Sequence, residues 1–177
     1  MSNYQSPLSD EEQEQLVVLL GRMVWPLQPR VFHALVNKTV TVAIELVVFN
    51  SEGKVLLECR KDIEYDGYAL PGTVLRDNED IPTATKRLFE KEIRSQVSEP
   101  VSLGWMEIQK GTELGQDLYR HYIALLYSSK LEGPYLGGGE FFQVNQIPKN
   151  TLSHEKSIVE EVVKRITDSN QQILIST

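Results

Sequence analysis

The residues best suited to chemistry lie in one stretch near the middle of the chain, residues 71–95. A Pro-Gly pair ends at Gly72, Glu79 follows in a loop, and a predicted helix carries Arg87 and Glu92. A helix carboxylate beside a glycine carbonyl offers the oxygen ligands that Mg²⁺ prefers, and Mg²⁺ commonly shares the phosphates of a substrate. The same charges are also typical of a surface helix with scattered ion pairs, and charge alone favours that interpretation.

The elements around this stretch predict an α/β (α+β) domain with a mixed sheet. β-branched and apolar residues over 39–50 predict a buried strand, and a turn at 51–53 leads into a second strand over 54–60. Asp80 as cap and Pro82 in the first turn predict a helix over 80–95. Further strands are expected over residues 68–70, 101–110, 117–128 and 141–144, and a final amphipathic helix over residues 152–167.

An extra helix is expected ahead of this domain. Ser9 and Glu12 form a capping-box pattern, and apolar residues then recur at helical spacing until Pro26 and Pro29 end the helix. We therefore divide the chain into an N-terminal arm and helix, residues 1–36, and a main domain, residues 37–177. The helix is expected to pack onto the main domain or onto a second copy of the chain, which would give a homodimer.

Composition excludes several classes of protein. The 177 residues include 18 Lys and Arg against 25 Asp and Glu, and the net charge of −7 disfavours non-specific nucleic-acid binding. The apolar run over residues 16–20 is far shorter than the roughly 20 residues that cross a bilayer, so no membrane partner is expected. The single cysteine, Cys59, cannot form an internal disulfide. We expect a cytoplasmic protein in which Cys59 is a small buried side chain.

The spacing in residues 73–95 resembles the Nudix hydrolase signature, G-x5-E-x7-R-E-U-x-E-E-x-G-U, in which U is a bulky aliphatic residue. Thr73 stands at the first Gly position, and Glu79, Arg87 and Glu92 fall on signature positions. The likeness covers residues 37–166, which is most of the chain. It implies the Nudix fold, a mixed β-sheet sandwiched between helices, here with an extra N-terminal helix.

The departures from the signature point to one branch of that family. Leu88 and Lys91 replace two of the three helix glutamates, and Arg94 replaces the final Gly. Arg87-Leu88-x-x-x-Glu92 is similar to the pattern of the GDP-mannose mannosyl hydrolases. The strand over residues 42–48, the turn over 50–54 and the pair at 121–122 also resemble that branch. The resemblance implies one Mg²⁺, or Mn²⁺ in its place, that neutralises a departing diphosphate while water attacks the anomeric carbon of a sugar.

The resemblance assigns roles to residues of the signature stretch. Gly72, through its main-chain carbonyl, and Glu92 would hold the metal. Glu79 would be a further ligand or a brace for the start of the helix. Arg87 would orient Glu92 or contact phosphate, and the charge of Lys91 would face the substrate.

Other assignments fall on the strands and on a glycine-rich loop. Arg60 would clamp the diphosphate, because a planar guanidinium suits phosphate oxygens. Glu45 would assist the leaving group or act as base, or it is an acidic side chain on the solvent side of the sheet. Glu140 would be a base or ligand in place of the loop His of that branch, or a solvated loop residue. Tyr68 and Trp105 would stack on a base or, by default in strands, pack in the core.

These observations lead to three functional hypotheses. The first is a Mg²⁺-dependent Nudix hydrolase of a nucleoside-diphosphate sugar or a related nucleoside diphosphate derivative. The second is a catalytically weak or inactive Nudix domain that binds a nucleotide or nucleotide sugar. The third is an NTP pyrophosphohydrolase in which Glu90 replaces a lost ligand, although Glu90 and Glu92 do not share a face of an ideal helix.

Overall fold

The computed structural model describes residues 7–61, 66–115, 118 and 120–175, with side chains as far as residue 169. The chain forms two compact units, residues 1–35 and 36–177. Within the described part of the chain, no helix has both the length and the apolar character that a membrane span requires.

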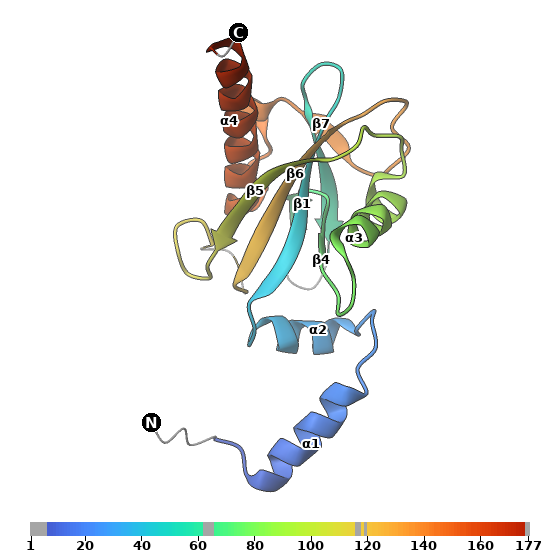
Figure 1. Ribbon diagram of the computed structural model, residues 1–177, viewed down its shortest axis with the longest axis vertical. Helices are drawn as coiled ribbons and strands as arrows, with labels where there is room; N and C mark the ends of the chain where they lie inside the picture. The colour runs from blue at the N-terminus through green and yellow to red at the C-terminus, as the bar shows by residue number, and fades with distance from the viewer. Residues whose placement is uncertain (1–6, 62–65, 116–117, 119, 176–177) are drawn as a thin grey trace. The chain divides into compact units, whose positions relative to one another are not determined.

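The N-terminal unit contains helix α1 (Asp10–Gly21), which begins as the sequence predicts (Figure 1). The Glu12 amide donates to the Ser9 hydroxyl at 3.3 Å, and the Glu12 carboxylate accepts from the Ser9 amide at 2.8 Å, which completes the capping box. A second helix, α2 (Pro29–Val36), was not expected. The sequence predicts that Pro29 ends a helix, whereas Pro29 is the first residue of α2. This position tolerates proline, because the N–H of the first helical residue makes no hydrogen bond within the helix.

The second unit is built on a seven-stranded mixed sheet in the order β3-β2-β1-β6-β5, with β4 paired to β1 and β7 paired to β2. This confirms the predicted α/β (α+β) class with a mixed sheet. The strands are β1 (Thr41–Phe49), β2 (Val55–Lys61), β3 (Asp66–Ala69), β4 (Gly72–Val74), β5 (Val101–Ile108), β6 (Tyr122–Lys130) and β7 (Glu140–Phe142). The continuous apolar run of β1 reflects its place between β4, β2 and β6, with helices over both faces of the sheet.

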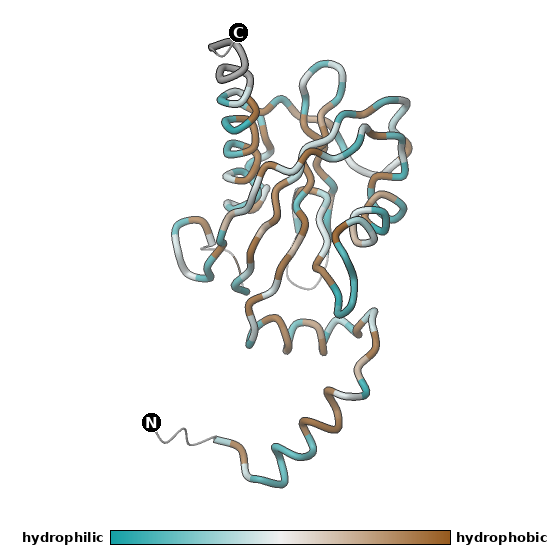
Figure 2. Tube along the Cα trace, in the orientation of Figure 1, coloured by the Kyte–Doolittle hydropathy of each residue, from teal (hydrophilic) through white to brown (hydrophobic). Residues whose placement is uncertain are grey.

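Two hydrophobic layers sandwich the sheet. On one face, Ile44 and Leu56 pack against Leu88 and Ile93, which belong to helix α3 (Ile81–Leu88) and the π turn η1 (Phe89–Ile93). On the other face, helix α4 (Ser153–Ile175) contributes buried residues such as Val159. Figure 1 shows α3 and α4 on opposite sides of the sheet. In Figure 2 the brown, apolar segments follow the strands between them.

Some element boundaries differ from the expectation. The strand predicted over 117–128 runs from Tyr122 to Lys130, and its expected start includes residues 117 and 119, which lie outside the described residues. Helix α4 begins at Ser153 and continues to Ile175, beyond the predicted end at residue 167. A short 3₁₀ turn, η2 (Val144–Gln146), follows β7.

Two expected burial states were wrong. Cys59 is exposed, as are Arg60 and Lys61 after it in the second half of β2. Trp105 is 61% exposed, because β5 is an edge strand of the sheet. Of the two alternatives for Glu45, the structure excludes a side chain on the solvent side of the sheet, because Glu45 is 4% exposed in the middle of β1. Alternation along a strand does not reveal which strands lie at an edge or which ends are covered.

Candidate functional site

The loop between β4 and α3 is closed by a paired Glu79 and Arg87. Arg87 Nε donates to Glu79 Oε1 and Arg87 Nη2 donates to Glu79 Oε2, both at 2.7 Å. The Arg76 amide adds a third hydrogen bond to Glu79 Oε2, at 3.1 Å. The side chains of Arg87 and Glu79 are only 17% and 9% exposed. This fork geometry is the strong form of an ion pair, and the hydrogen bond from Arg87 lowers the pKa of Glu79.

Arg87 also ties the helix to β4. Its Nη1 donates to the Thr73 hydroxyl, and its Nη2 donates to the Val74 carbonyl at 3.1 Å. The hydrogen bonds of Arg87 therefore position the loop and Glu79, while Glu92 is held by another contact. Thr73, at the first Gly position of the signature, has a structural role as acceptor.

Glu92 lies in a π turn. The Arg94 amide donates to the Phe89 carbonyl at 2.8 Å, a bond across five residues, and Arg94 ends the turn in the left-handed region at φ 53°. Such a turn inserts one residue relative to an α-helix and is frequent at functional sites. In the observed structure, the Gly72 amide donates to Glu92 Oε2 at 3.2 Å. The signature Gly position is thus occupied by a left-handed Arg94.

Gly72 lies between two carboxylates. A Cβ added at Gly72 would come within 2.5 Å of Glu45 Oε2 and within 3.1 Å of the Ile44 carbonyl. Its amide is bonded to Glu92, and β4 pairs Gly72 with Glu45 in register on β1. Only glycine allows the backbone to pass this close to both groups.

The charges around Glu92 are mixed. Burial raises the pKa of Glu92, and the charge of Glu58 raises it further, whereas the Gly72 amide, Arg60 and Arg87 lower it. Among the described residues, no Lys, Arg or His makes an ion pair with Glu92. Sequence reasoning missed Glu58, although strand alternation places it on the same face as Leu56 and Arg60.

A second buried group of polar side chains surrounds Glu45. Burial raises the pKa of Glu45 well above its ordinary value, the charge of Glu155 on α4 raises it further, and Arg120 and Arg60 lower it. Glu155 is 5% exposed, accepts from the Leu70 amide at 3.3 Å and lies 3.4 Å from His154 Nε2. Sequence reasoning missed Glu155, because it lies 85 residues from Leu70.

Tyr68 and Glu140, predicted for different roles, contact each other. The Tyr68 hydroxyl donates to Glu140 Oε1 at 2.8 Å, and the rings of Tyr68 and Phe142 pack edge to face at 5.0 Å. The hydrogen bond raises the pKa of Tyr68. Arg60 and Lys91 are both exposed.

The predicted residues therefore separate into three groups. Gly72, Glu92 and Glu45 come together at the start of β4. Glu79 and Arg87 form a closed pair in the loop. Tyr68 and Glu140 form a third contact, between β3 and β7.

The donor set allows a small metal site. In the part of the chain that the structure describes, no three His, Cys, Asp or Glu side chains are grouped to hold a metal ion. Glu79 is already bonded through both oxygens to Arg87. What fits a cation is Glu92, a largely buried carboxylate without an ion-pair partner among the described residues, beside the Gly72 main chain. Mg²⁺ is commonly bound by one or two carboxylates together with substrate phosphates.

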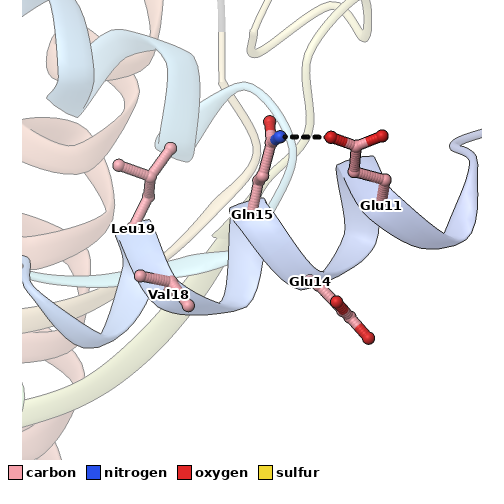
Figure 3. A pocket seen from close by; sticks show the side chains of 5 residues that line it. All are labelled: Glu11, Glu14, Gln15, Val18 and Leu19. Carbon is pink, nitrogen blue, oxygen red and sulfur yellow. Dashed lines mark hydrogen bonds between the residues drawn. The ribbon is translucent and has the colours of Figure 1, made fainter.

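A shallow pocket on α1 lies apart from these residues in sequence. It is lined by five side chains of α1 alone, Glu11, Glu14, Gln15, Val18 and Leu19 (Figure 3). Gln15 Nε2 donates to Glu11 Oε1 there at 3.2 Å. None of the predicted site residues lines this pocket.

Comparison with known proteins gives similarity in structure only. No protein-family model and no curated protein matches the sequence. A MutT protein from Methanosarcina mazei Go1 has a TM-score of 0.58 at 14% identity, over 72% of this chain and 95% of that one. A MutT NUDIX hydrolase from Burkholderia pseudomallei has a TM-score of 0.57 at 16% identity, over 71% and 99%.

A third similar structure contains a ligand. It is the NUDIX domain of Shewanella oneidensis NrtR complexed with ADP ribose, with a TM-score of 0.54 at 16% identity, over 88% of this chain and 98% of that one. At these identities the likeness establishes architecture. The mixed sheet with its helices matches these structures in fold, and the chain has the Nudix fold.

Proposed function

We propose that this protein is a Nudix-type hydrolase of a nucleoside-diphosphate sugar or a related nucleoside diphosphate derivative. The observation that carries the proposal is the hydrogen bond from the Gly72 amide to Glu92, in a loop–helix segment braced by Glu79 and Arg87. The Glu79–Arg87 pair and the Gly72–Glu92 hydrogen bond together keep the Glu92 carboxylate oriented beside the Gly72 main chain. A cation bound to a phosphate of the substrate would find oxygen ligands there.

Gly72, through its carbonyl, and Glu92 would hold one Mg²⁺ or Mn²⁺. When bound, this ion would neutralise negative charge on the departing diphosphate. Arg60 and Lys91, both exposed cations, would bind the phosphates from the open side. Glu79 would act through Arg87 as a brace, since both of its oxygens are engaged.

Water would attack the anomeric carbon, whose bond to the phosphate oxygen would break to give free sugar and nucleoside diphosphate. We propose Glu140 as the base that takes the proton of this water, because it is exposed and its orientation is set by the Tyr68 hydroxyl. Glu45 would assist the leaving group from its buried position against Gly72.

The substrate class has independent support from structures with the same fold. One is bound to ADP ribose, and another is described as a UDP-X diphosphatase, with a TM-score of 0.57 at 17% identity. Both names refer to nucleoside diphosphates that carry a further group.

Product analysis tests the proposal. The protein would be incubated with Mg²⁺ and a panel of nucleotide sugars and nucleoside triphosphates, alongside Glu92→Gln and the matched control Glu90→Gln. Glu90 is an exposed neighbour that lies 3.9 Å from Lys86. We expect free sugar and nucleoside diphosphate from wild type and from Glu90→Gln, and no turnover from Glu92→Gln.

One observation favours a second candidate, a Nudix domain that binds a nucleotide or nucleotide sugar without turnover. The described residues hold no group of three metal-binding side chains. Absence of product from the whole panel, together with calorimetric binding of a nucleotide sugar that EDTA leaves unchanged, would establish this alternative. The NTP pyrophosphohydrolase hypothesis gains no comparable support, because Glu90 is exposed and lies near Lys86.

A further inference from the structure

Tyr135 attaches the glycine-rich segment, residues 133–139, to β2. Its hydroxyl donates to Glu58 Oε1 at 2.6 Å and accepts from the Gly139 amide at 3.0 Å. Its ring packs edge to face on Phe141, with centroids 5.4 Å apart. Burial and the hydrogen bond to Glu58 raise the pKa of Tyr135 to about 12, so the hydroxyl remains a donor at neutral pH.

The backbone of the segment also lies close to β2 at Gly139. A Cβ at Gly139 would stand 2.5 Å from the Leu57 carbonyl and 3.0 Å from Glu58 Cδ. Because Gly139 has no side chain, its main chain can pass this close to β2, where its amide donates to the Tyr135 hydroxyl. The segment fixes one carboxylate oxygen of Glu58 and restricts the rotamers of its side chain.

Glu58 is held on the face of the sheet that carries Glu92. Leu56, two residues earlier on β2, belongs to the hydrophobic layer of Leu88 and Ile93. Side chains two apart on a strand share a face, so Glu58 faces the π turn that contains Glu92. The raised pKa of Glu92 agrees with this placement, since the charge of Glu58 contributes to it.

Neither carboxylate has an ion-pair partner among the described residues. Glu58 is bonded to a neutral hydroxyl, and Glu92 to a main-chain amide. Their carboxylate oxygens are the ligands that Mg²⁺ and Mn²⁺ prefer, and Mg²⁺ is commonly bound by one or two carboxylates together with substrate phosphates.

We propose that Tyr135 is a positioning residue that holds Glu58 toward Glu92, so that Glu58 supplies the second carboxylate for the divalent cation of the proposed function. This inference rests on that function. Glu58 on β2 would then replace a carboxylate that the helix lacks, since Leu88 and Lys91 stand at two glutamate positions of the signature. Glu58 acts on the cation directly, and Tyr135 acts through Glu58.

Binding of Mn²⁺ to the full chain without substrate tests the inference. The electron paramagnetic resonance signal of free Mn²⁺ would be titrated with wild type, Glu92→Gln, Glu58→Gln and Tyr135→Phe. The matched control is Tyr68→Phe, which removes the similar hydroxyl–carboxylate bond to Glu140. Tyr135→Phe keeps the ring contact with Phe141, and Glu58→Asp keeps the charge if Glu58→Gln does not fold.

We expect Glu92→Gln to abolish binding, Glu58→Gln to weaken it at least about tenfold, and Tyr135→Phe to weaken it by a similar or smaller factor. Tyr68→Phe should bind as wild type does. A purely structural role of Tyr135 would lower the melting temperature and leave Mn²⁺ affinity unchanged. Wild-type affinity in Glu58→Gln or Tyr135→Phe would overturn the inference and leave the proposed function standing. A wild-type chain that binds no Mn²⁺ would overturn both.

Discussion

Glu79 and Glu92 are both acidic residues of the signature stretch, residues 73–95, but their hydrogen-bond partners and the directions of their pKa shifts differ. Glu79 is bonded through both oxygens to a buried guanidinium, and its pKa is lowered. Glu92 is held by one main-chain amide, lacks an ion-pair partner among the described residues, and has a raised pKa. The first residue stabilises the loop, and the second keeps an unbalanced charge that a ligand can use. Spacing in the sequence does not distinguish these two roles.

The largest expected effect comes from breaking the Glu79–Arg87 pair. Arg87→Ala leaves a buried carboxylate unpaired and removes the bonds to Thr73 and Val74, so we expect the free energy of unfolding to fall by about 3 kcal/mol. Urea denaturation measures this. The matched control is Lys86→Ala on the same helix, whose ion pair with Glu90 is exposed and 3.9 Å long, and which should change stability by less than about 0.5 kcal/mol. Equal effects of the two variants would show that the pair does not brace the loop.

A smaller effect on stability is expected from a substitution at Gly72, whose amide holds the Glu92 carboxylate. In Gly72→Ala, the new methyl group would meet Glu45 Oε2 and the Ile44 carbonyl, and the backbone atom cannot move aside as a side chain can. We expect a loss of about 2 kcal/mol in stability together with weaker Mn²⁺ binding, because Glu92 depends on the Gly72 amide. Gly133→Ala is the control, since its nearest atom lies 4.0 Å away. Unchanged Mn²⁺ affinity in Gly72→Ala would separate Glu92 from the proposed metal site.

The sequence predicted most of the scaffold, because local rules govern it. Apolar runs identified β1 and β2, Asp80 and Pro82 marked the start of α3, and the capping box marked α1. The Gly72–Glu92 contact and the pairing of Glu79 with Arg87 lie within the stretch that the sequence singled out, although neither hydrogen bond was predicted.

What the sequence did not predict depends on long-range packing. Tyr135 lies 77 residues from Glu58, and Glu155 lies 85 residues from Leu70, so neither contact has a local signal. Trp105 was placed in the core because a strand pattern does not indicate which strands are at the edge, and Cys59 because it does not indicate which part of a strand is covered. The π turn changes the register of the helix after Leu88. The helical periodicity of the sequence gives no signal of this change.

The smallest expected effect is the opposite response of Glu79 and Glu92 to pH. The lowered pKa of Glu79 means that its contribution to stability is complete above the ordinary value of 4.5 and is lost as the pH falls through the folded-state pKa. The raised pKa of Glu92 means that its cost is absent below 4.5, increases as the pH rises toward the folded-state pKa, and persists above it.

Urea denaturation between about pH 2 and pH 7, without divalent ions, compares the two through Glu79→Gln and Glu92→Gln. At pH 7, Glu79→Gln should be less stable than wild type and Glu92→Gln slightly more stable. The difference at Glu92 should disappear as the pH falls to the ordinary value of 4.5, whereas the difference at Glu79 should shrink only below that value. Addition of Mg²⁺ should stabilise wild type and leave Glu92→Gln unchanged, because a ligand that binds only the folded state raises its stability. If Glu92→Gln is the less stable protein at pH 7 in the absence of metal, the carboxylate is a structural acceptor like Glu79, and the contrast between the two residues disappears.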